Sequence, residues 1–358
     1  MPLRGIPSYP PSATLGSDGD SGLQLSPAKG NAGHERTLLR QRPEWGPAPL
    51  GITRGRQCPC GAFRPILPSL CYGRMVIDLH CHSLHSDGTD TPGGLALLGE
   101  EGRLTALCLT DHDTLDGIPA FLAMQPQVKV RLLVGTELSC EFLGQSLHVL
   151  GLLVDPSDAR FQARLVELRS RREDRNRRML VRLAELGCPL TLEDVQAQAD
   201  SPLLSRVHFA KALAARGFVR RAPEAFERLI GDDCPGFVPR EELSPSEAAR
   251  WIREAGGVPV VAHPGRFARG GFPWDEAMAD LQRQGLEGLE GYYGEYRAAE
   301  QKYFVALAAR LGMVVTGGSD YHGAHKTGLR LGRGRGGLQV PDDLLERLET
   351  QQRLGAHH

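Results

Sequence analysis

The sequence predicts an α/β fold, in which seven strands form a closed or nearly closed barrel with helices around it. Two observations indicate this class. Seven short, nearly continuous apolar runs follow Met75, and helix-length segments separate most of them. This pattern is typical of parallel strands that are buried on both faces, and seven such strands favour a β/α barrel. A doubly wound open sheet is the alternative, because a strand count does not establish closure.

The predicted strands all lie after residue 74. They cover residues 75–79, 104–109, 130–137, 146–153, 258–262, 286–293 and 313–318. Residues 1–74 are rich in Pro, Gly, Ser and Arg and show no sustained period of 2 or 3.6 residues, so we expect this segment to be a disordered tail. Alternatively, the natural protein starts at Met75 and the segment is a non-native N-terminal extension.

A helical insertion interrupts the strands. Between Asp155 and Gly257 there is no strand pattern, and helices are predicted over 163–187, 205–217 and 244–257. Gly187, Gly217 and Gly256 would end these helices, and Ser244 and Pro245 would begin the third. We therefore expect a first barrel part at 75–155, an insertion that caps the substrate at 156–243, a second barrel part at 244–340, and a C-terminal helix and tail at 341–358.

The composition excludes several classes of protein. With 41% hydrophobic and 24% charged residues, the chain has the balance of a globular protein with a full core. A net charge of -1 provides no overall attraction to nucleic acid or to an anionic membrane. No membrane-spanning run and no secretory signal are apparent, so we expect a cytoplasmic protein with neither a membrane nor an obligate protein partner. Cys58, Cys60 and Cys71 lack the second pair that a zinc site needs.

Histidines and carboxylates recur where the predicted strands end, which is where β/α barrels assemble their active sites. Two imidazoles in a His-x-His pair point to the same side of a strand, because side chains alternate with period 2. His85 and Cys81 belong to no repeated spacing, so we do not expect them to be ligands. His148 alone would also suit a hydrogen-bonded core position. The candidate metal ligands are His80, His82, Asp87, His112, Glu137, His148, His263, Asp320 and His322.

Nine candidate ligands are too many for one ion and suit two or three divalent ions. Imidazoles and carboxylates without thiolates fit Mn²⁺, with Zn²⁺ or Fe²⁺ as alternatives. Clustered divalent ions bind phosphoryl oxygens and lower the pKa of water. The residues therefore predict hydrolysis of a phosphate ester. Gly317 and Gly318 would let the last strand pack closely beside the site.

Six segments, taken in order, resemble the motifs of the polymerase and histidinol phosphatase (PHP) family. They are DLHCHSLHSDG (78–88), TDHDT (110–114), GTELSC (135–140), HVLGLLVD (148–155), AGGVPVVAHPGR (255–266) and TGGSDYHG (316–323). The chain is most similar to members with a helical insertion, the bacterial 3',5'-nucleoside bisphosphate phosphatases, some of which are also 5'-3' exoribonucleases. The resemblance implies a distorted seven-stranded barrel and a trinuclear metal site.

The resemblance also implies roles for individual residues. His80, His82, Glu137 and Asp320 would hold the first ion; Asp87, His112 and His322 the second; and Glu137, His148 and His263 the third. A hydroxide between the first two ions would be the nucleophile. The residues expected to act in catalysis are Asp87, His112, His263 and Asp320.

Substrate contacts are expected from the insertion and from the segment after the fifth strand. Ser205, Arg206 and His208 resemble a motif that family members turn toward the active site, although Val207 stands where proline is usual. Arg206 and Arg266 would suit bidentate phosphate contacts. A surface salt bridge is the alternative for Arg206.

Two further features have alternative interpretations. The basic run 169–178 would track a nucleic-acid backbone, but its interleaved acidic residues favour a solvated helix face. Tyr292 and Tyr293 are either base-stacking residues or part of the barrel core.

Together these features predict a metal-dependent phosphoesterase that removes the 3'-phosphate of nucleoside 3',5'-bisphosphates. Exonuclease action on short 5'-phosphorylated RNA is an additional expectation, so the expected partner is a nucleotide or a short RNA. A histidinol-phosphate phosphatase is one alternative. A non-catalytic PHP module that only binds is another, and such a module would be expected to have lost ligands.

Overall fold

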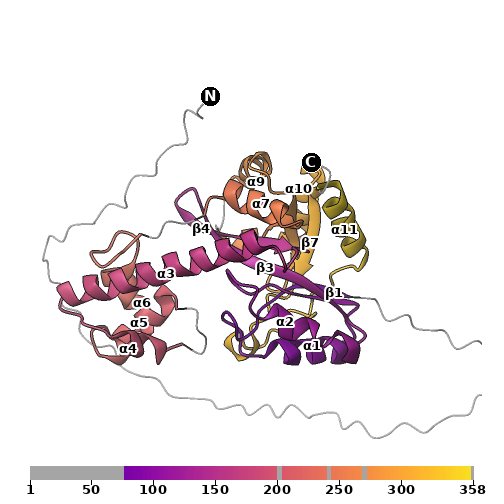
Figure 1. The fold of residues 1–358 in the computed structure, drawn as a ribbon. Coiled ribbons are helices and arrows are strands. Elements are labelled where there is room, and N and C mark those ends of the chain that lie inside the picture. Colours follow the sequence, from indigo (N-terminus) through magenta and orange to yellow (C-terminus); the bar gives the residue numbers. More distant parts are fainter. Residues whose placement is uncertain (1–75, 200–203, 240–242, 268–271, 356–358) are drawn as a thin grey trace, which may run out of the picture. The chain divides into compact units, whose positions relative to one another are not determined.

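A computed structural model of the chain describes residues 76–199, 204–239, 243–267 and 272–355 (Figure 1). The tail predicted at 1–74, with Cys58, Cys60 and Cys71, lies outside the described residues, as does Met75. Seven strands follow one another in a single sheet in sequence order. They are β1 (Ile77–Cys81), β2 (Ala106–Leu109), β3 (Arg131–Phe142), β4 (Gln145–Leu152), β5 (Val258–Val261), β6 (Gly288–Tyr293) and β7 (Val314–Gly318).

The first and last strands meet and bring the barrel close to closure. The backbone N–H of His82 donates to the carbonyl of Tyr321 at 2.9 Å, and the N–H of Asp320 donates to the carbonyl of His80 at 2.8 Å. These bonds lie just beyond β7, at the end of β1 that carries the histidines. The nearly closed seven-stranded barrel is therefore confirmed, and the doubly wound alternative is wrong.

Strand β4 departs from the prediction of parallel strands, because it pairs antiparallel with both β3 and β5. A two-residue loop joins β3 to β4, and both of its residues, Leu143 and Gly144, have positive φ (52° and 73°). Two positive φ values are the requirement of the tight hairpin turn that matches strand twist. Strand β3 also extends to Phe142, so Glu137 lies within the strand and not at its end.

The strands are buried on both faces, as the continuous apolar runs predict. In β2, Ala106 and Cys108 belong to one apolar cluster, whereas Leu107 and Leu109 belong to another. This division follows from the period of 2. The helices of the barrel are α1 (Pro92–Glu101), α2 (Ile118–Leu122), η1 (Gln125–Gln127), α7 (Pro245–Glu254), α8 (Pro264–Phe267), α9 (Trp274–Arg283), α10 (Ala298–Leu311), η3 (Gly323–His325) and α11 (Asp343–Gly355).

Between β4 and β5 the chain forms helices with an apolar cluster of their own. These are α3 (Ala159–Glu185), α4 (Leu192–Gln196), α5 (Arg206–Ala215), α6 (Ala222–Ala225) and the π-helical turn η2 (Phe226–Ile230). Figure 1 shows α3 running from the barrel strands to the smaller helices. None of the helices in the described ranges is both long enough and apolar enough to cross a membrane.

Helix α3 has a buried stripe that changes in character along its length. Phe161, Leu165 and Leu168 pack in the barrel cluster, and Met179 and Leu183 pack in the cluster of the smaller helices. Between these two apolar groups lie three buried polar residues, Arg172, Arg175 and Asn176. The prediction that residues 169–178 form a solvated helix face is therefore wrong for these three.

The helix ends predicted from capping residues are confirmed. Gly187, Gly217 and Gly256 follow α3, α5 and α7, with φ values of 77°, 78° and 72°. The Ser244 hydroxyl accepts the N–H of Glu247 at 3.3 Å and caps α7. These signals are local in sequence, so they could be read without knowledge of the fold.

Gly318 permits the close contact between β7 and β1. A Cβ at this position would lie 2.3 Å from the Cβ of His80 and 2.5 Å from its backbone nitrogen. We expect Gly318→Ala to lower the free energy of unfolding by about 1–3 kcal/mol, because neither strand has room to move. Urea unfolding monitored by circular dichroism would measure the change. Gly337→Ala, where a Cβ meets no atom within 4 Å, is the control, and equal stability of the two variants would contradict this interpretation.

Candidate metal centre

The His-x-His pair of β1 forms the centre of the site. His80 and His82 are fully buried, and their Nε2 atoms lie 3.1 Å apart. Asp320 Oδ1, from the segment after β7, lies 3.5 Å from His80 Nε2 and 3.3 Å from His82 Nε2. The period of the strand thus directs both imidazoles to one side, and the meeting of β1 with β7 adds the carboxylate.

The β3–β4 hairpin supplies Glu137 and His148. Ser139 pairs with His148 across the hairpin, so Glu137, two residues before Ser139, shares a face with His148 and is its diagonal neighbour. Their side chains meet, with His148 Nδ1 at 2.8 Å from Glu137 Oε1. Because β4 runs in the opposite direction, a residue in its first half lies at the end of the barrel where the parallel strands finish.

Glu137 contacts imidazoles with both carboxylate oxygens. Its Oε2 lies 3.2 Å from His80 Nε2, 3.1 Å from His82 Nε2 and 3.4 Å from His112 Nε2. Its Oε1 lies 2.8 Å from His148 Nδ1 and 2.9 Å from His263 Nε2. The two oxygens therefore divide the cluster into two halves that one carboxylate connects.

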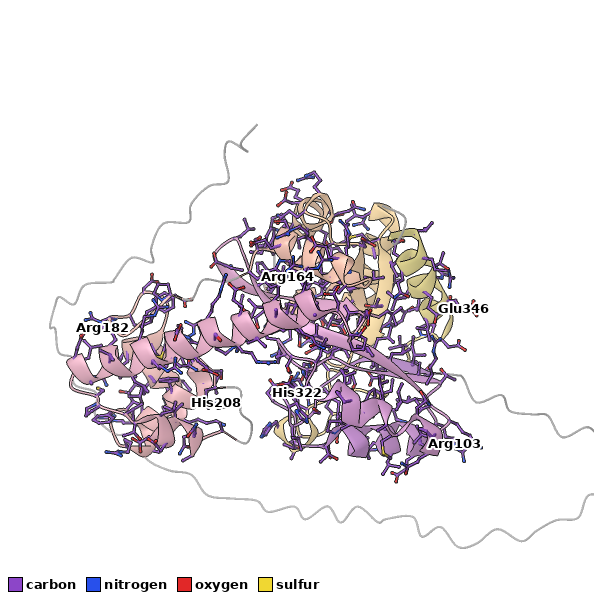
Figure 2. All side chains as sticks on the ribbon, in the orientation of Figure 1. Arg103, Arg164, Arg182, His208, His322 and Glu346 are labelled. Atoms are coloured by element: carbon purple, nitrogen blue, oxygen red, sulfur yellow. The ribbon has the colours of Figure 1, made fainter. Side chains whose placement is uncertain are left out.

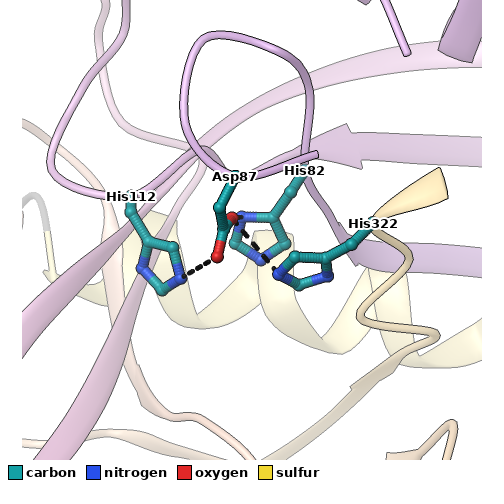
Figure 3. A group of neighbouring side chains, drawn as sticks. All are labelled: His82, Asp87, His112 and His322. Carbon is teal, nitrogen blue, oxygen red and sulfur yellow. Dashed lines mark ion pairs between the residues drawn. The ribbon is translucent and has the colours of Figure 1, made fainter. Parts of the chain in front are cut away.

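Three of the candidate ligands, His82, His112 and His322, lie around Asp87 (Figure 3). Its Oδ1 lies 3.2 Å from His322 Nε2, and its Oδ2 lies 3.6 Å from His112 Nε2. Asp111 shapes the loop that carries Asp87: its Oδ1 accepts the N–H of Ser83 at 2.7 Å and the hydroxyl of Ser86 at 2.6 Å. Asp111 therefore holds the loop by hydrogen bonds to its neighbours.

Three groups of side chains have ligand atoms within 4.8 Å of one another. The groups are His82 with Asp87, His112 and His322; His80 with His82, Glu137 and Asp320; and His112 with Glu137 and His148. His263 joins them through Glu137. All nine predicted candidates are thus brought together, and the donors are imidazoles and carboxylates, as the chemistry of Mn²⁺, Fe²⁺ or Zn²⁺ requires. Which atoms bind which ion stays a prediction.

The imidazoles of the cluster have pKa values displaced in opposite directions. Burial would lower the pKa of His82, but its hydrogen bonds with Asp320 and Glu137 raise it to about 9, so a cation that binds there must displace a proton. Burial lowers the pKa of His112 to about 4, which keeps this imidazole neutral and able to coordinate. Burial alone would raise the pKa of Glu137, but the surrounding imidazoles hold it well below its usual range. For Asp320, burial is likewise outweighed by His80 and His322, and its pKa is well below normal. The carboxylates are therefore charged within a dry cluster.

Residues in unusual backbone conformations concentrate at this site. Six described non-glycine residues have positive φ, and three of them, Asp113, His263 and Asp320, belong to or adjoin the cluster. Such conformations cost free energy and persist only where surrounding contacts enforce them. The N–H of His263, for example, donates to Glu290 Oε2 at 2.7 Å.

Glu290 is a buried carboxylate beside the cluster that the sequence interpretation missed. It is fully buried, and its Oε1 lies 3.0 Å from Nδ1 of His80. This contact directs the other ring nitrogen, Nε2, toward Glu137 and Asp320, in the manner of a second carboxylate behind a metal-binding histidine. The signal was present in the sequence, because a charged residue in a buried strand requires a partner.

The predicted substrate residues divide into two sets. Ser205, His208 and Arg266 line a cavity of about 580 Å³ that has the cluster in its wall; His208 and His322, both labelled in Figure 2, face it from the insertion and the barrel. Arg206 is not among the lining residues. Its Nη1 lies 2.5 Å from Asp232 Oδ1, the salt-bridge arrangement that was the alternative.

Two lysines that line the cavity were missed by the sequence interpretation. They are Lys211 on α5 and Lys326 after η3, and neither stands in a distinctive motif.

Tyr293 has a different role from base stacking. It is only 2% exposed, and its hydroxyl donates to Asp320 Oδ2 at 2.8 Å. The core alternative is therefore right for Tyr293, and base stacking is wrong. His85 and Cys81 lie outside all three ligand groups.

Comparison with known proteins agrees with this geometry. The PHP domain family matches residues 78–191. The chain is 32% identical over 257 residues to the 3',5'-nucleoside bisphosphate phosphatase of Chromobacterium violaceum, covering 72% of this chain and 90% of that protein. It is 29% identical over 245 residues to a 5'-3' exoribonuclease of Haemophilus influenzae, covering 68% and 89%. A Bifidobacterium adolescentis structure described as a metal-dependent phosphoesterase superposes with a TM-score of 0.64 at 30% identity, covering 77% and 96%.

A nearly closed seven-stranded barrel with this cluster of donors and these relatives is a metal-dependent phosphoesterase. The chain belongs to the PHP family. The expected family and the expected class of enzyme are therefore both confirmed.

We expect Glu290→Gln to weaken metal binding. Glu290 accepts two donors, His80 Nδ1–H and the His263 N–H, whereas a glutamine offers one oxygen and sets an NH₂ group against the other donor. The Mn²⁺ concentration that gives half-maximal hydrolysis of an aryl phosphate should rise about 10–100-fold. Glu101→Gln, on the exposed face of α1, is the control. An unchanged Mn²⁺ dependence in Glu290→Gln would show that Glu290 does not orient His80.

Proposed function

We propose that this enzyme removes the 3'-phosphate from nucleoside 3',5'-bisphosphates, with 5'-3' exonuclease action on short 5'-phosphorylated RNA as a second activity. One observation carries the proposal. A cavity with candidate metal ligands in its wall is also lined by cationic side chains from both the barrel and the insertion. This arrangement suits a substrate with a reacting phosphate and at least one further anionic group.

The reacting phosphate would lie at the ligand cluster. We assign two to three divalent ions to it, Mn²⁺ in the first place and Zn²⁺ or Fe²⁺ as alternatives, with the ligand sets that the family motifs imply. Bound there, the ions would polarise phosphoryl oxygens and lower the pKa of water, so that a nucleophile forms near neutral pH. The trinuclear arrangement is supported by the two halves that Glu137 connects.

Arg266 and Lys326 would stabilise the reacting phosphate. Both contact Asp320 Oδ2, Arg266 through Nη1 at 3.4 Å and Lys326 through Nζ. These contacts leave Asp320 Oδ1 directed toward His80 and His82. Two cations beside the candidate metal site can bind phosphoryl oxygens as charge develops during hydrolysis.

The second phosphate would lie at the insertion wall, near Ser205, His208 and Lys211. A hydroxyl, an imidazole and an ammonium group together offer hydrogen bonds and charge to a phosphate. A cavity of about 580 Å³ is within the usual range for binding a ligand of this size. The motif role of Arg206 requires its guanidinium to leave Asp232, so we place Lys211 before Arg206 in this role.

The alternatives receive less support. Eight of the nine candidate ligands form the three groups and His263 contacts Glu137 at 2.9 Å, so every position keeps a competent side chain, which disfavours a module that only binds. Histidinol phosphate carries a single phosphate, so it would leave the lysine of the insertion wall without an anion to bind. The exonuclease activity rests on the Haemophilus influenzae relative and on the same cavity.

Metal content tests the proposed centre. Elemental analysis of the purified protein should find at least two equivalents of Mn, Fe or Zn, and removal by a chelator should abolish hydrolysis until metal is restored. His80→Ala should lower the metal content, because a ligand of the central group is lost. It should also lower kcat/KM by at least about 100-fold. His85→Ala, in the neighbouring loop but outside the groups, is the matched control. A metal-free protein that turns over substrate would exclude the proposed centre.

A substrate panel with Mn²⁺ tests the proposed specificity. We expect the highest kcat/KM for a 3',5'-bisphosphate, compared with mononucleotides, short 5'-phosphorylated RNA and histidinol phosphate. Lys211→Met should raise KM for the bisphosphate about tenfold and spare a generic aryl phosphate, because it removes one charge-assisted contact to the second phosphate. Arg206→Ala should have a smaller effect. If Lys211→Met affects both substrates equally, Lys211 does not recognise the second phosphate.

A further inference from the structure

Arg172 is a buried arginine at the junction of α3 with the barrel. It is 9% exposed and lies on α3 between the part that packs in the barrel cluster and the part that packs in the cluster of the smaller helices. An arginine is almost never buried unless its charge is paired. Its partner is Asp113, which is 1% exposed and stands 59 residues earlier in the chain.

The pair is connected to β3 as well as to β2. Arg172 Nη2 donates to Asp113 Oδ2 and, at 3.0 Å, to the hydroxyl of Ser139. Asp113 in turn accepts the Ser139 N–H at 2.9 Å and its hydroxyl at 3.2 Å. Ser139 is the residue that pairs with His148 across the hairpin. One guanidinium therefore holds the loop after β2 and the hairpin together.

Each of these partners adjoins a member of one ligand group, that of His112, Glu137 and His148. Asp113 follows His112 directly and has a left-handed backbone with φ of 53°. Its N–H donates to the carbonyl of Glu137 at 3.0 Å. The contacts of Arg172 thus lead to His112 and Glu137 through Asp113, and to His148 through the pairing of Ser139 with His148.

The position of the His112 ring depends on the backbone around Asp113 more than the rings of His80 and His322 depend on theirs. His80 and His322 each have Nδ1 held, by Glu290 at 3.0 Å and by the carbonyl of Asp320 at 2.8 Å. In the part of the chain that the structure describes, Nδ1 of His112 is buried and has no hydrogen-bond partner. Its Nε2 lies 3.4 Å from Glu137 Oε2 and 3.6 Å from Asp87 Oδ2, so with no partner at Nδ1 the position of the ring depends on these two carboxylates and on the backbone that Asp113 anchors.

We propose that Arg172 and Asp113 form a positioning pair that couples the helical insertion to the ligand group of His112, Glu137 and His148. The pair fixes the loop that presents His112, and the far half of the same helix packs in one apolar cluster with α5, which carries His208 and Lys211 of the insertion wall. Arg169, one turn earlier, adds a hydrogen bond of 2.6 Å to Thr114 Oγ1 in the same loop. The inference rests on the proposed metal centre and assigns to one of its groups a dependence on α3.

The test is a double-mutant cycle of Arg172→Met, Asp113→Asn and the double variant, measured by Mn²⁺ binding in titration calorimetry with elemental analysis. Each single variant should raise the dissociation constant of at least one Mn²⁺ equivalent about 10–100-fold relative to the wild type. The double variant should be no worse than the weaker-binding single variant, because both changes break the same pair. Arg172→Lys keeps the positive charge but loses the planar guanidinium that donates to both Asp113 and Ser139. Its Mn²⁺ dissociation constant should lie between those of the wild type and Arg172→Met.

Arg177→Met is the matched control, since Arg177 lies on the exposed face of α3 and pairs there with Asp174 at 2.8 Å. It should bind Mn²⁺ as the wild type does. If Arg172→Met does not fold, Ser139→Ala gives the same readout, because it removes the hydroxyl that both partners share. Additive losses in the double variant, or Mn²⁺ binding unchanged in every variant, would overturn the positioning role. If the wild type itself binds no metal, the proposed metal centre is wrong. If the wild type binds metal and every variant binds it equally well, only the positioning role of Arg172 and Asp113 is wrong.

Discussion

The contacts of the Glu137 carboxylate are the constraint on which the rest of the structure depends. Five imidazoles surround its two oxygens at 2.8–3.4 Å. Removing such a carboxylate from water costs several kcal/mol unless positive charge surrounds it. Divalent cations are the compensation that the donor set fits. The surrounding fold can therefore be understood as a means of holding acids and imidazoles within reach of the same ions.

Two features of the barrel meet this requirement. The antiparallel hairpin places Glu137 and His148 side by side, because reversal of β4 brings its first half to the end of the barrel where the other strands finish. The contact between β1 and β7 brings Asp320 to the histidines of β1, and it depends on the absence of a side chain at Gly318. A strictly parallel barrel could not supply the first of these juxtapositions, so the departure from β/α regularity serves the site.

The positions of the strands and helix ends could be predicted, because apolar runs, glycine caps and N-caps are local signals. The same holds for the His80 and His82 pair, whose shared direction follows from strand period alone. The hairpin could not be predicted with equal ease, since its turn places Leu143 at a positive φ that leucine rarely adopts. The burial of Arg172 depends on Asp113, which is distant in sequence, so its position in a basic run suggested a solvated face instead.

In the proposed assignment, substrate recognition and chemistry lie on different parts of the chain that share helix α3. The donors of the candidate metal centre come from the barrel, whereas Ser205, His208 and Lys211 come from the insertion. Under this proposal, sequence changes in the insertion alter which substrate fits without changing a candidate ligand. Helix α3 limits this independence, because it is buried in the apolar clusters of both parts. Helix α3 is therefore one of the links through which the position of the insertion bears on the barrel, and Arg172 is its buried charge beside the loop of His112.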